Sequence, residues 1–299
     1  MSLFSRPLVG LSLTDPDEGV LRYAAMLARM LRWNDVHFLH VVPPDHSRTF
    51  DPRPWQEKLQ AEVSRLFDDP KLDCQLTFHA AEGSRLDNIL KTAAEHERDL
   101  VVLGHRRTHR GRWSLARRTA MVAPSSVWLV PEGSPPEIRE ILVPTDFSKP
   151  SADALSVAVK VAQAANLKEL RALHVFFDTL SDRFDEHLEE VFGKEKEQFQ
   201  LHVESADAGQ VVIDPIYHES AHASQAILRV AERNGSDLIV MNTRGRSQAA
   251  FVLLGSTTSE TMAASTVPVL ALKHFGARMS LLQALRNHYL GEQQEPTAG

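Results

Sequence analysis

Glycines and hydroxyl side chains follow an apolar segment late in the chain, in an order that suits phosphate binding. The segment 237–241, which is apolar after Asp237 and ends with Met241, is followed by Asn242, Gly245, Arg246, Gly255, Ser256 and Thr257. Because glycine has no Cβ atom, backbone N–H groups beside it can approach an anion closely. The start of a following helix adds N–H groups without intrahelical partners and a partial positive charge. The segment therefore predicts a phosphate-binding loop.

A carboxylate follows an earlier apolar segment. Residues 141–143 are apolar, and Pro144, Thr145 and Asp146 come directly after them. An Asp at the end of a strand can accept hydrogen bonds from a ribose or a base. It can also cap a helix that begins near Ser148, and the two roles are compatible. Together with the phosphate loop, Asp146 indicates a nucleotide site.

The chain repeats itself, and each half reads as one domain. His174 follows His40 by 134 residues, and Val143 follows Val9 by the same 134. Further along, residues 99–103 match residues 237–241 at an offset of 138. A stretch rich in Pro, Gly and Ser at residues 131–136 marks the boundary. We expect domains at 1–133 and 137–275, and then a C-terminal helix and disordered tail within 276–299.

Strands alternate with helices in each half, which predicts an α/β fold. In the second half the expected strands are residues 141–144, 170–176, 211–217, 237–241 and 267–272. Such alternation is typical of a parallel sheet, here five-stranded in each domain, with helices on both faces. Ser148 is placed to cap the first helix of this half, and Pro150 suits its first turn.

These elements must bring the polar residues together. Ligands of open parallel sheets bind outside the carboxyl ends of the strands, where neighbouring connections diverge. Pro144, Thr145 and Asp146 would meet there with Val175 from the second strand and with the loop after Met241. The expected nucleotide site therefore combines residues from three strand ends.

The second half resembles a domain of the universal stress protein family. The resemblance rests on residues 141–148, the pair His174 and Val175, residues 237–241, the glycine loop and residues 267–270. With the more divergent first half it covers nearly the whole chain. It implies two tandem adenine-nucleotide α-hydrolase-like domains.

The same resemblance implies an ATP or AMP ligand, with Mg²⁺ as a companion ion. Asp146 would then meet the ribose or base, and the Val175 backbone would meet the adenine. The phosphates would be surrounded by Gly245, Gly255, Ser256 and Thr257.

Asn242 stands where the family's loop has its first glycine. Asn tolerates left-handed backbone better than other non-glycine residues, so the loop can keep its shape, but its side chain adds bulk where the nucleotide approaches. The first half departs further, with Ser12 at the position of Asp146 and Arg107 at that of Gly245. We therefore expect one nucleotide per chain, bound by the second half.

Six arginines replace the glycine loop in the first half. They lie between Arg106 and Arg118, in a segment without acidic residues. Arginine binds carboxylates and phosphates through paired N–H groups, so this segment suits an acidic partner. The alternative is a solvated basic surface. The net charge of −6 argues against nucleic acid and against an anionic membrane as partners.

The sequence shows no catalytic or metal-binding set. His218 and His222 have the spacing of one helical face, but no third ligand lies near them in sequence. The matched strand positions of His40 and His174 indicate a structural role. No general base or nucleophile is recognisable, which favours a non-catalytic stress-response protein that senses ATP or AMP. The alternatives are a weak ATPase, with Asp146 holding a metal or orienting water, and an interaction scaffold without a ligand.

Composition favours a cytoplasmic protein. The chain has 299 residues, 43% of them hydrophobic, and its single cysteine, Cys74, excludes an internal disulfide. No apolar run reaches the roughly 18 residues of a membrane span, and the N-terminus lacks the apolar core of a signal peptide. A homodimer is one assembly that such a chain allows.

Overall fold

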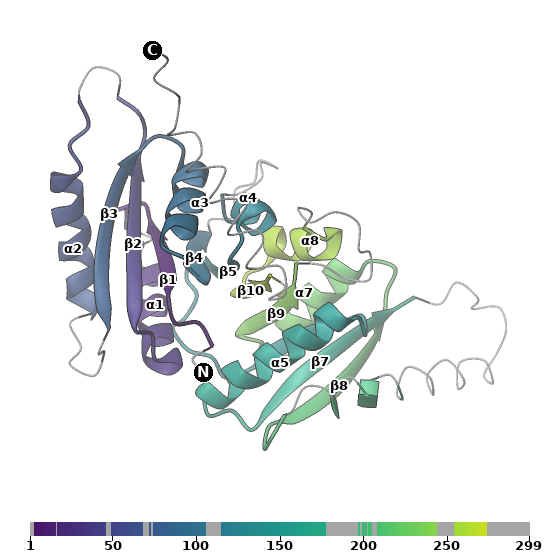
Figure 1. Ribbon diagram of the computed structural model, residues 1–299. Helices are drawn as coiled ribbons and strands as arrows, with labels where there is room; N and C mark the ends of the chain where they lie inside the picture. The colour runs from purple at the N-terminus through teal and green to yellow at the C-terminus, as the bar shows by residue number, and fades with distance from the viewer. Residues whose placement is uncertain are drawn as a thin grey trace, which may run out of the picture. The chain divides into compact units, whose positions relative to one another are not determined.

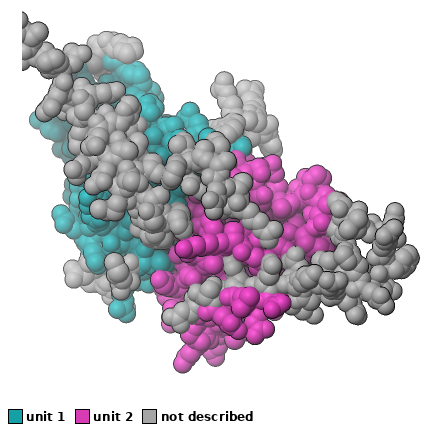
Figure 2. Space-filling view, turned by 45° about the vertical axis from the view of Figure 1, so that its right-hand side comes forward, with its two compact units in different colours: residues 1–136, 273–299 teal, residues 137–272 magenta. Residues whose placement is uncertain are grey.

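The computed structural model describes residues 3–15, 17–45, 49–67, 72, 74–105, 115–177, 197, 199–201, 203–204, 208–243 and 254–273. The chain divides into two compact units, one formed by residues 1–136 with 273–299 and the other by residues 137–272 (Figure 2). The division after Pro136 falls at the end of the stretch rich in Pro, Gly and Ser. The segment 276–299, for which the sequence predicts a helix and a tail, lies outside the described residues.

The first unit is a parallel sheet with the strand order β3-β2-β1-β4-β5. Its elements in chain order are β1 (Pro7–Leu11), α1 (Asp17–Leu31), β2 (Asp35–Val42), α2 (Arg53–Phe67), β3 (Gln75–Glu82), α3 (Arg85–Glu95), β4 (Leu100–His105), α4 (Leu115–Val122) and β5 (Ser126–Pro131). Helix α1 packs on β1, β4 and α2, whereas α3 packs on β2 and α4, so helices cover both faces (Figure 1).

The second unit repeats this plan with the strand order β10-β9-β6-β7-β8. Its elements are β6 (Ile141–Thr145), α5 (Lys149–Ala164), β7 (Glu169–Phe176), β8 (Val212–Glu219), α7 (Ala223–Arg233), β9 (Leu238–Asn242), α8 (Ser256–Ala264) and β10 (Val269–Leu272). The α/β fold and its parallel sheets are confirmed, and the predicted strands of this half are correct to within two residues at each end. Among the described residues, no helix has the length and apolar character that crossing a bilayer requires.

The central strands are buried on both faces, which explains their continuous apolar sequences. Every residue of β9 and β10 is buried, as are the first four residues of β4. Helices α1 and α5 turn small side chains toward the sheet, including Ala24, Ala28, Ala158 and Ala162. Small side chains let these helices approach the central strands closely.

The two units also share unusual backbone conformations. Left-handed φ angles of 50–62° occur at three matched pairs of residues, at the same 134- and 138-residue offsets as the sequence repeat: Leu13 and Phe147, Arg32 and Asn166, Glu97 and Gly235. The first pair lies in the turn that follows the first strand of each unit. Because most of these residues are not glycine, the turn geometry is imposed by the surrounding fold.

A carboxylate before the fourth strand holds the first strand in each unit. Asp99 accepts hydrogen bonds from two backbone N–H groups just before β1, at 2.8 and 3.1 Å. Asp237 does the same just before β6, at 2.9 and 3.2 Å. The repeat therefore preserves a specific polar contact as well as the strand pattern.

This contact predicts a loss of stability in Asp237→Ala. Two backbone N–H groups, one of them partly buried, lose their acceptor, and we expect the free energy of unfolding of the second unit to fall by about 1–3 kcal/mol. Asp214→Ala is the matched control. Each carboxylate lies near an arginine Nε, at 3.8 Å for Asp214 and 3.6 Å for Asp237, but the Asp214 side chain is 53% exposed and that of Asp237 is 12% exposed. Urea denaturation measures both variants, and equal losses would contradict the role assigned to the N–H bonds.

Candidate functional site

The strand order of the second unit creates a point of divergence beside β6. This strand lies between β9 and β7. From β6 the chain passes through α5 to β7, whereas from β9 it passes through α8 to β10 on the other side (Figure 1). The carboxyl ends of β6 and β9 therefore border the switch point, where open α/β sheets bind their ligands.

The turn after β6 is held by its own polar side chains. Thr145 is buried, and its Oγ1 accepts a hydrogen bond from the Phe147 N–H at 3.1 Å. Asp146 Oδ1 accepts from the Ser148 N–H at 3.1 Å. Ser148 Oγ in turn accepts from the Ser151 N–H at 3.3 Å, which confirms Ser148 as the cap of α5. Asp146 thus shapes the turn and remains partly exposed at the strand end.

A buried histidine ties this turn to β7. His174 Nδ1 donates to the carbonyl oxygen of Thr145 at 2.9 Å, and the Phe147 ring stacks on the imidazole with centroids 4.2 Å apart. In the first unit, His40 Nδ1 donates to the carbonyl oxygen of Leu11 at 3.0 Å. Burial lowers the pKa of His40, so its ring is neutral near pH 7. The structural role predicted for both histidines is confirmed.

Asn242 contacts α5 through its side chain. It is the buried last residue of β9, and its Nδ2 donates to the carbonyl oxygen of Pro150, in the first turn of α5, at 3.0 Å. The matching residue of the first unit is Gly104, where an added Cβ would lie 2.8 Å from Val20 of α1. The side chain at this position therefore points to the helix covering the sheet. Asn242 has the extended backbone of a strand, in place of the left-handed conformation considered from the sequence.

Helix α8 begins with a residue that has no side chain. Its N-cap is Gly255, whose N–H donates to the Thr243 carbonyl at 2.8 Å, and Thr258 Oγ1 donates to the last carbonyl of β9 at 2.8 Å. The first-turn N–H groups of Ser256 and Thr257 have no acceptor within the helix. Ser256 is exposed and Thr257 partly exposed. The helix start thus offers N–H groups, hydroxyls and the positive end of the helix dipole.

The other predicted site residues differ in accessibility. Met241 is buried within β9, and Pro144 is partly exposed in β6. Val175 is partly exposed and lies one residue beyond the pairing of β6 with β7, which ends where Thr145 faces His174. Gly245 and Arg246 lie outside the described residues.

Two further predictions from the sequence concern the arginine-rich segment and the pair His218 and His222. Residues 106–114 of the arginine-rich segment lie outside the described residues, whereas Arg117 is partly exposed and Arg118 exposed in α4. The helical spacing considered for His218 and His222 is wrong. His218 belongs to β8 and His222 is the N-cap of α7, so no single helix presents both rings.

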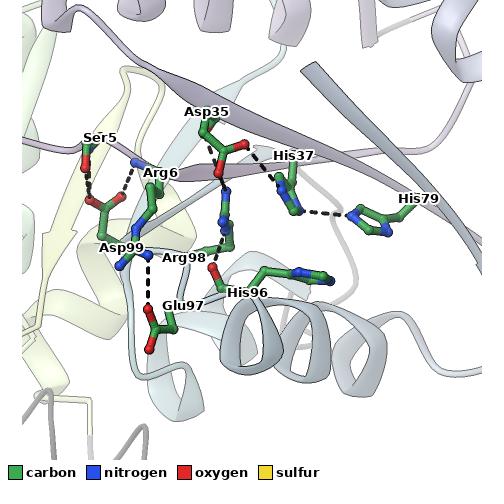
Figure 3. Close-up of polar contacts among 9 residues, drawn as sticks. All are labelled: Ser5, Arg6, Asp35, His37, His79, His96, Glu97, Arg98 and Asp99. Atoms are coloured by element: carbon green, nitrogen blue, oxygen red, sulfur yellow. Dashed lines mark hydrogen bonds and ion pairs between the residues drawn. The ribbon is translucent and has the colours of Figure 1, made fainter. Parts of the chain in front are cut away.

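Three histidines that the sequence analysis did not group meet in the first unit (Figure 3). They are His37 in β2, His79 in β3 and His96 at the end of α3, and their nitrogen atoms lie within 4.8 Å of one another. Burial is the main cause that lowers the pKa of His37 to about 4, and it also lowers that of His79. The only signal in the sequence is the placement of His37 and His79 in neighbouring strands. Their proximity depends on the register that sets Leu39 opposite His79, and nothing local links either of them to His96.

Comparison with known proteins identifies the family. The sequence pattern of the Universal stress protein family matches residues 4–131 and again residues 137–273. Both halves of the described fold are included, and together the matches span most of the chain. The protein therefore belongs to the universal stress protein family, as a tandem member with two such domains.

One curated protein and two solved structures illustrate what this chain is similar to. Universal stress protein MJ0577 of Methanocaldococcus jannaschii is 29% identical over 156 residues, which are 45% of this chain and 94% of that protein. The structure of a universal stress protein from Archaeoglobus fulgidus covers 91% of this chain and 98% of its own, with a TM-score of 0.62 at 20% identity. A Pseudomonas aeruginosa protein of unknown function covers 95% and 98%, with a TM-score of 0.69 at 16% identity. These two structures share the fold over most of the chain.

A shorter match concerns a universal stress protein solved in complex with cAMP. It covers 46% of this chain and 97% of that protein, at 24% identity and a TM-score of 0.39. An adenine nucleotide is thus bound by that member of the family.

The contact of Asn242 with α5 predicts that Asn242→Asp is destabilising. The substitution keeps the shape of the side chain but replaces the donating amide, 3.0 Å from the Pro150 carbonyl, with an acceptor. We expect a loss of about 1–3 kcal/mol in the free energy of unfolding. Asn34→Asp, at an exposed position before β2, is the control and should cost about 0.5 kcal/mol or less. Denaturation curves that give the same midpoint for both variants would contradict the role assigned to the amide.

Proposed function

We propose that the second domain binds ATP or AMP and that the protein acts as a nucleotide-sensing regulator in a stress response. The observation that carries this proposal is the meeting of two features at one switch point, the open start of α8 and the turn containing Asp146. The first suits phosphates, and the second suits the hydroxyl groups of a ribose.

Each part of the nucleotide has proposed partners. Asp146 would contact the ribose or base, and the Val175 backbone would contact the adenine. The phosphates, with Mg²⁺ in the case of ATP, would lie at the residues that start α8 and at the loop before it, namely Gly245, Arg246, Gly255, Ser256 and Thr257. Pro144, Thr145 and Met241 would support these groups from the strand ends.

The orientation of Asn242 supports nucleotide binding. Its amide is engaged by the Pro150 carbonyl in α5. The Asn242 side chain, which the family's glycine lacks, therefore points to the face of the sheet that α5 covers. The start of α8 is held by backbone and hydroxyl contacts that do not involve this side chain.

The first domain is proposed to have a structural or partner-binding role. Ser12 stands at the position of Asp146, and its N–H and Oγ donate to the carboxylate of Asp17 at 2.6 and 3.0 Å. This turn thus uses a carboxylate of α1 to close itself and offers a hydroxyl in place of the strand-end Asp. The proposed partner is an acidic surface that pairs with the arginines between Arg106 and Arg118. A cytoplasmic location and a homodimer remain part of the proposal.

Ser256→Glu tests the phosphate position. Ser256 is the exposed first residue of α8, so a carboxylate there favours the helix dipole while repelling phosphates. We expect ATP affinity, measured by calorimetry on the full chain, to fall at least about tenfold, or 1.4 kcal/mol. Ala223→Glu places the same charge at the first residue of α7 and should leave affinity unchanged.

Native mass spectrometry and turnover assays separate the alternatives. One nucleotide mass per chain, lost in Ser256→Glu, supports the proposal. An intact chain that binds neither ATP nor AMP would support a ligand-free scaffold. Release of phosphate from labelled ATP, abolished by Asp146→Ala but retained by Asp214→Ala, would support the weak ATPase.

A further inference from the structure

The three histidines of the first unit form a compact set of nitrogen ligands. Their nitrogens lie within 4.8 Å of one another, and His79 Nε2 lies 3.0 Å from His37 Nδ1 (Figure 3). A tetrahedral ion with bonds of 2.0–2.1 Å to nitrogen separates its ligands by about 3.4 Å. Small rotations of side chains therefore suffice to bring the three rings to a common ion. His37 is buried, whereas His79 and His96 are partly exposed, which leaves solvent a path to the cluster.

A carboxylate stands behind His37, on the side away from the other rings. Asp35 Oδ1 is a buried atom without a hydrogen-bond partner among the described residues, and it lies 3.4 Å from His37 Nε2. A carboxylate can only accept, so this position favours the tautomer with hydrogen on Nε2. His37 Nδ1 then keeps a lone pair that faces His79. The same order of carboxylate, histidine and ion recurs in metal sites, where the carboxylate orients the ring.

A buried arginine holds this arrangement in place. Arg98 is 5% exposed, and its Nη1 pairs with Asp35 Oδ2 at 2.7 Å. Its Nε donates to the carbonyl oxygen of His96 at 2.6 Å. One guanidinium group therefore fixes both the carboxylate behind His37 and the backbone that carries His96 (Figure 3).

The second unit builds the same fold without the histidines. The strand registers place Arg171 and Ile216 at the positions of His37 and His79, and Asn234 follows α7 as His96 follows α3. There Arg171 pairs with Glu140 at 2.6 Å and approaches Asp214 at 3.8 Å, so the fold accepts a different polar group at this place and does not require histidines. Three imidazoles, a partly buried carboxylate and a buried arginine meet in one half only, and this difference points to a ligand.

We propose that His37, His79 and His96 bind a divalent transition-metal ion, with Zn²⁺ as the expected ion. Imidazole nitrogen suits Zn²⁺ and its neighbours, whereas Mg²⁺ and Ca²⁺ prefer oxygen ligands. Three protein ligands leave the fourth position of a tetrahedral ion for water or for an exchangeable group. Asp35 is a positioning residue, because its carboxylate orients the His37 ring through the ring's Nε2 atom.

Zinc binding by the full chain, stripped of metal with a chelator, tests this proposal. Competition with a chromophoric chelator should show one Zn²⁺ per chain, and Co²⁺ in its place should give the visible absorption of a tetrahedral site. His79→Gln and His96→Gln should each weaken Zn²⁺ binding at least about 100-fold, and Asp35→Asn about 10- to 100-fold. His222→Gln is the matched control, because His222 is exposed and belongs to the other unit.

The outcomes are distinct. Loss of binding in both cluster variants, with binding kept in His222→Gln and with unchanged circular dichroism, supports the site. A wild-type chain that takes up no Zn²⁺ would overturn it and leave the cluster as a hydrogen-bonded group only. Binding retained by both His79→Gln and His96→Gln would also overturn it, since the ion would then lie elsewhere. None of these measurements requires a nucleotide.

Discussion

The hydrogen bond from a buried histidine to the last carbonyl of the first strand organises both halves of this protein. His174 makes it to Thr145 and His40 makes it to Leu11. In each half the chain then turns through a left-handed residue, Phe147 or Leu13, which disfavours any side chain with a Cβ. The turn persists because the carbonyl before it is anchored to the neighbouring strand. The position of Asp146 and the cap of α5 both depend on this anchor.

In the second half, the first turn of α8 is left accessible beside the anchored end of β6. The glycine cap of α8 and the bond from Thr258 hold that helix to the end of β9 through groups that do not occupy its first N–H positions. The side chain of Asn242 joins the end of β9 to the first turn of α5. The contacts that stabilise the end of β9 therefore run to α5 and to α8. The proposed nucleotide would contact the same residues from the carboxyl-terminal end of the sheet.

The first half uses the same framework for different chemistry. Its turn is closed by Asp17, and its glycine at residue 104 allows Val20 of α1 to pack where the second half carries an amide. Its polar groups are concentrated instead between β2, β3 and the end of α3, where Arg98 and Asp35 hold the histidines. Duplication of one fold, followed by exchange of a few buried polar residues, accounts for two domains with separate proposed ligands.

The sequence by itself determined the repeat, the parallel α/β domains, the strands of the second half to within two residues, the Ser148 cap and the family. These features follow from local patterns: apolar runs, matched offsets and residues with strong positional preferences. The tertiary structure alone decided that Asn242 points to α5, that His218 and His222 belong to different elements, and that His37, His79 and His96 meet. Strand register and helix packing set these contacts. Both depend on the burial of many side chains at once, so no local pattern in the chain encodes them.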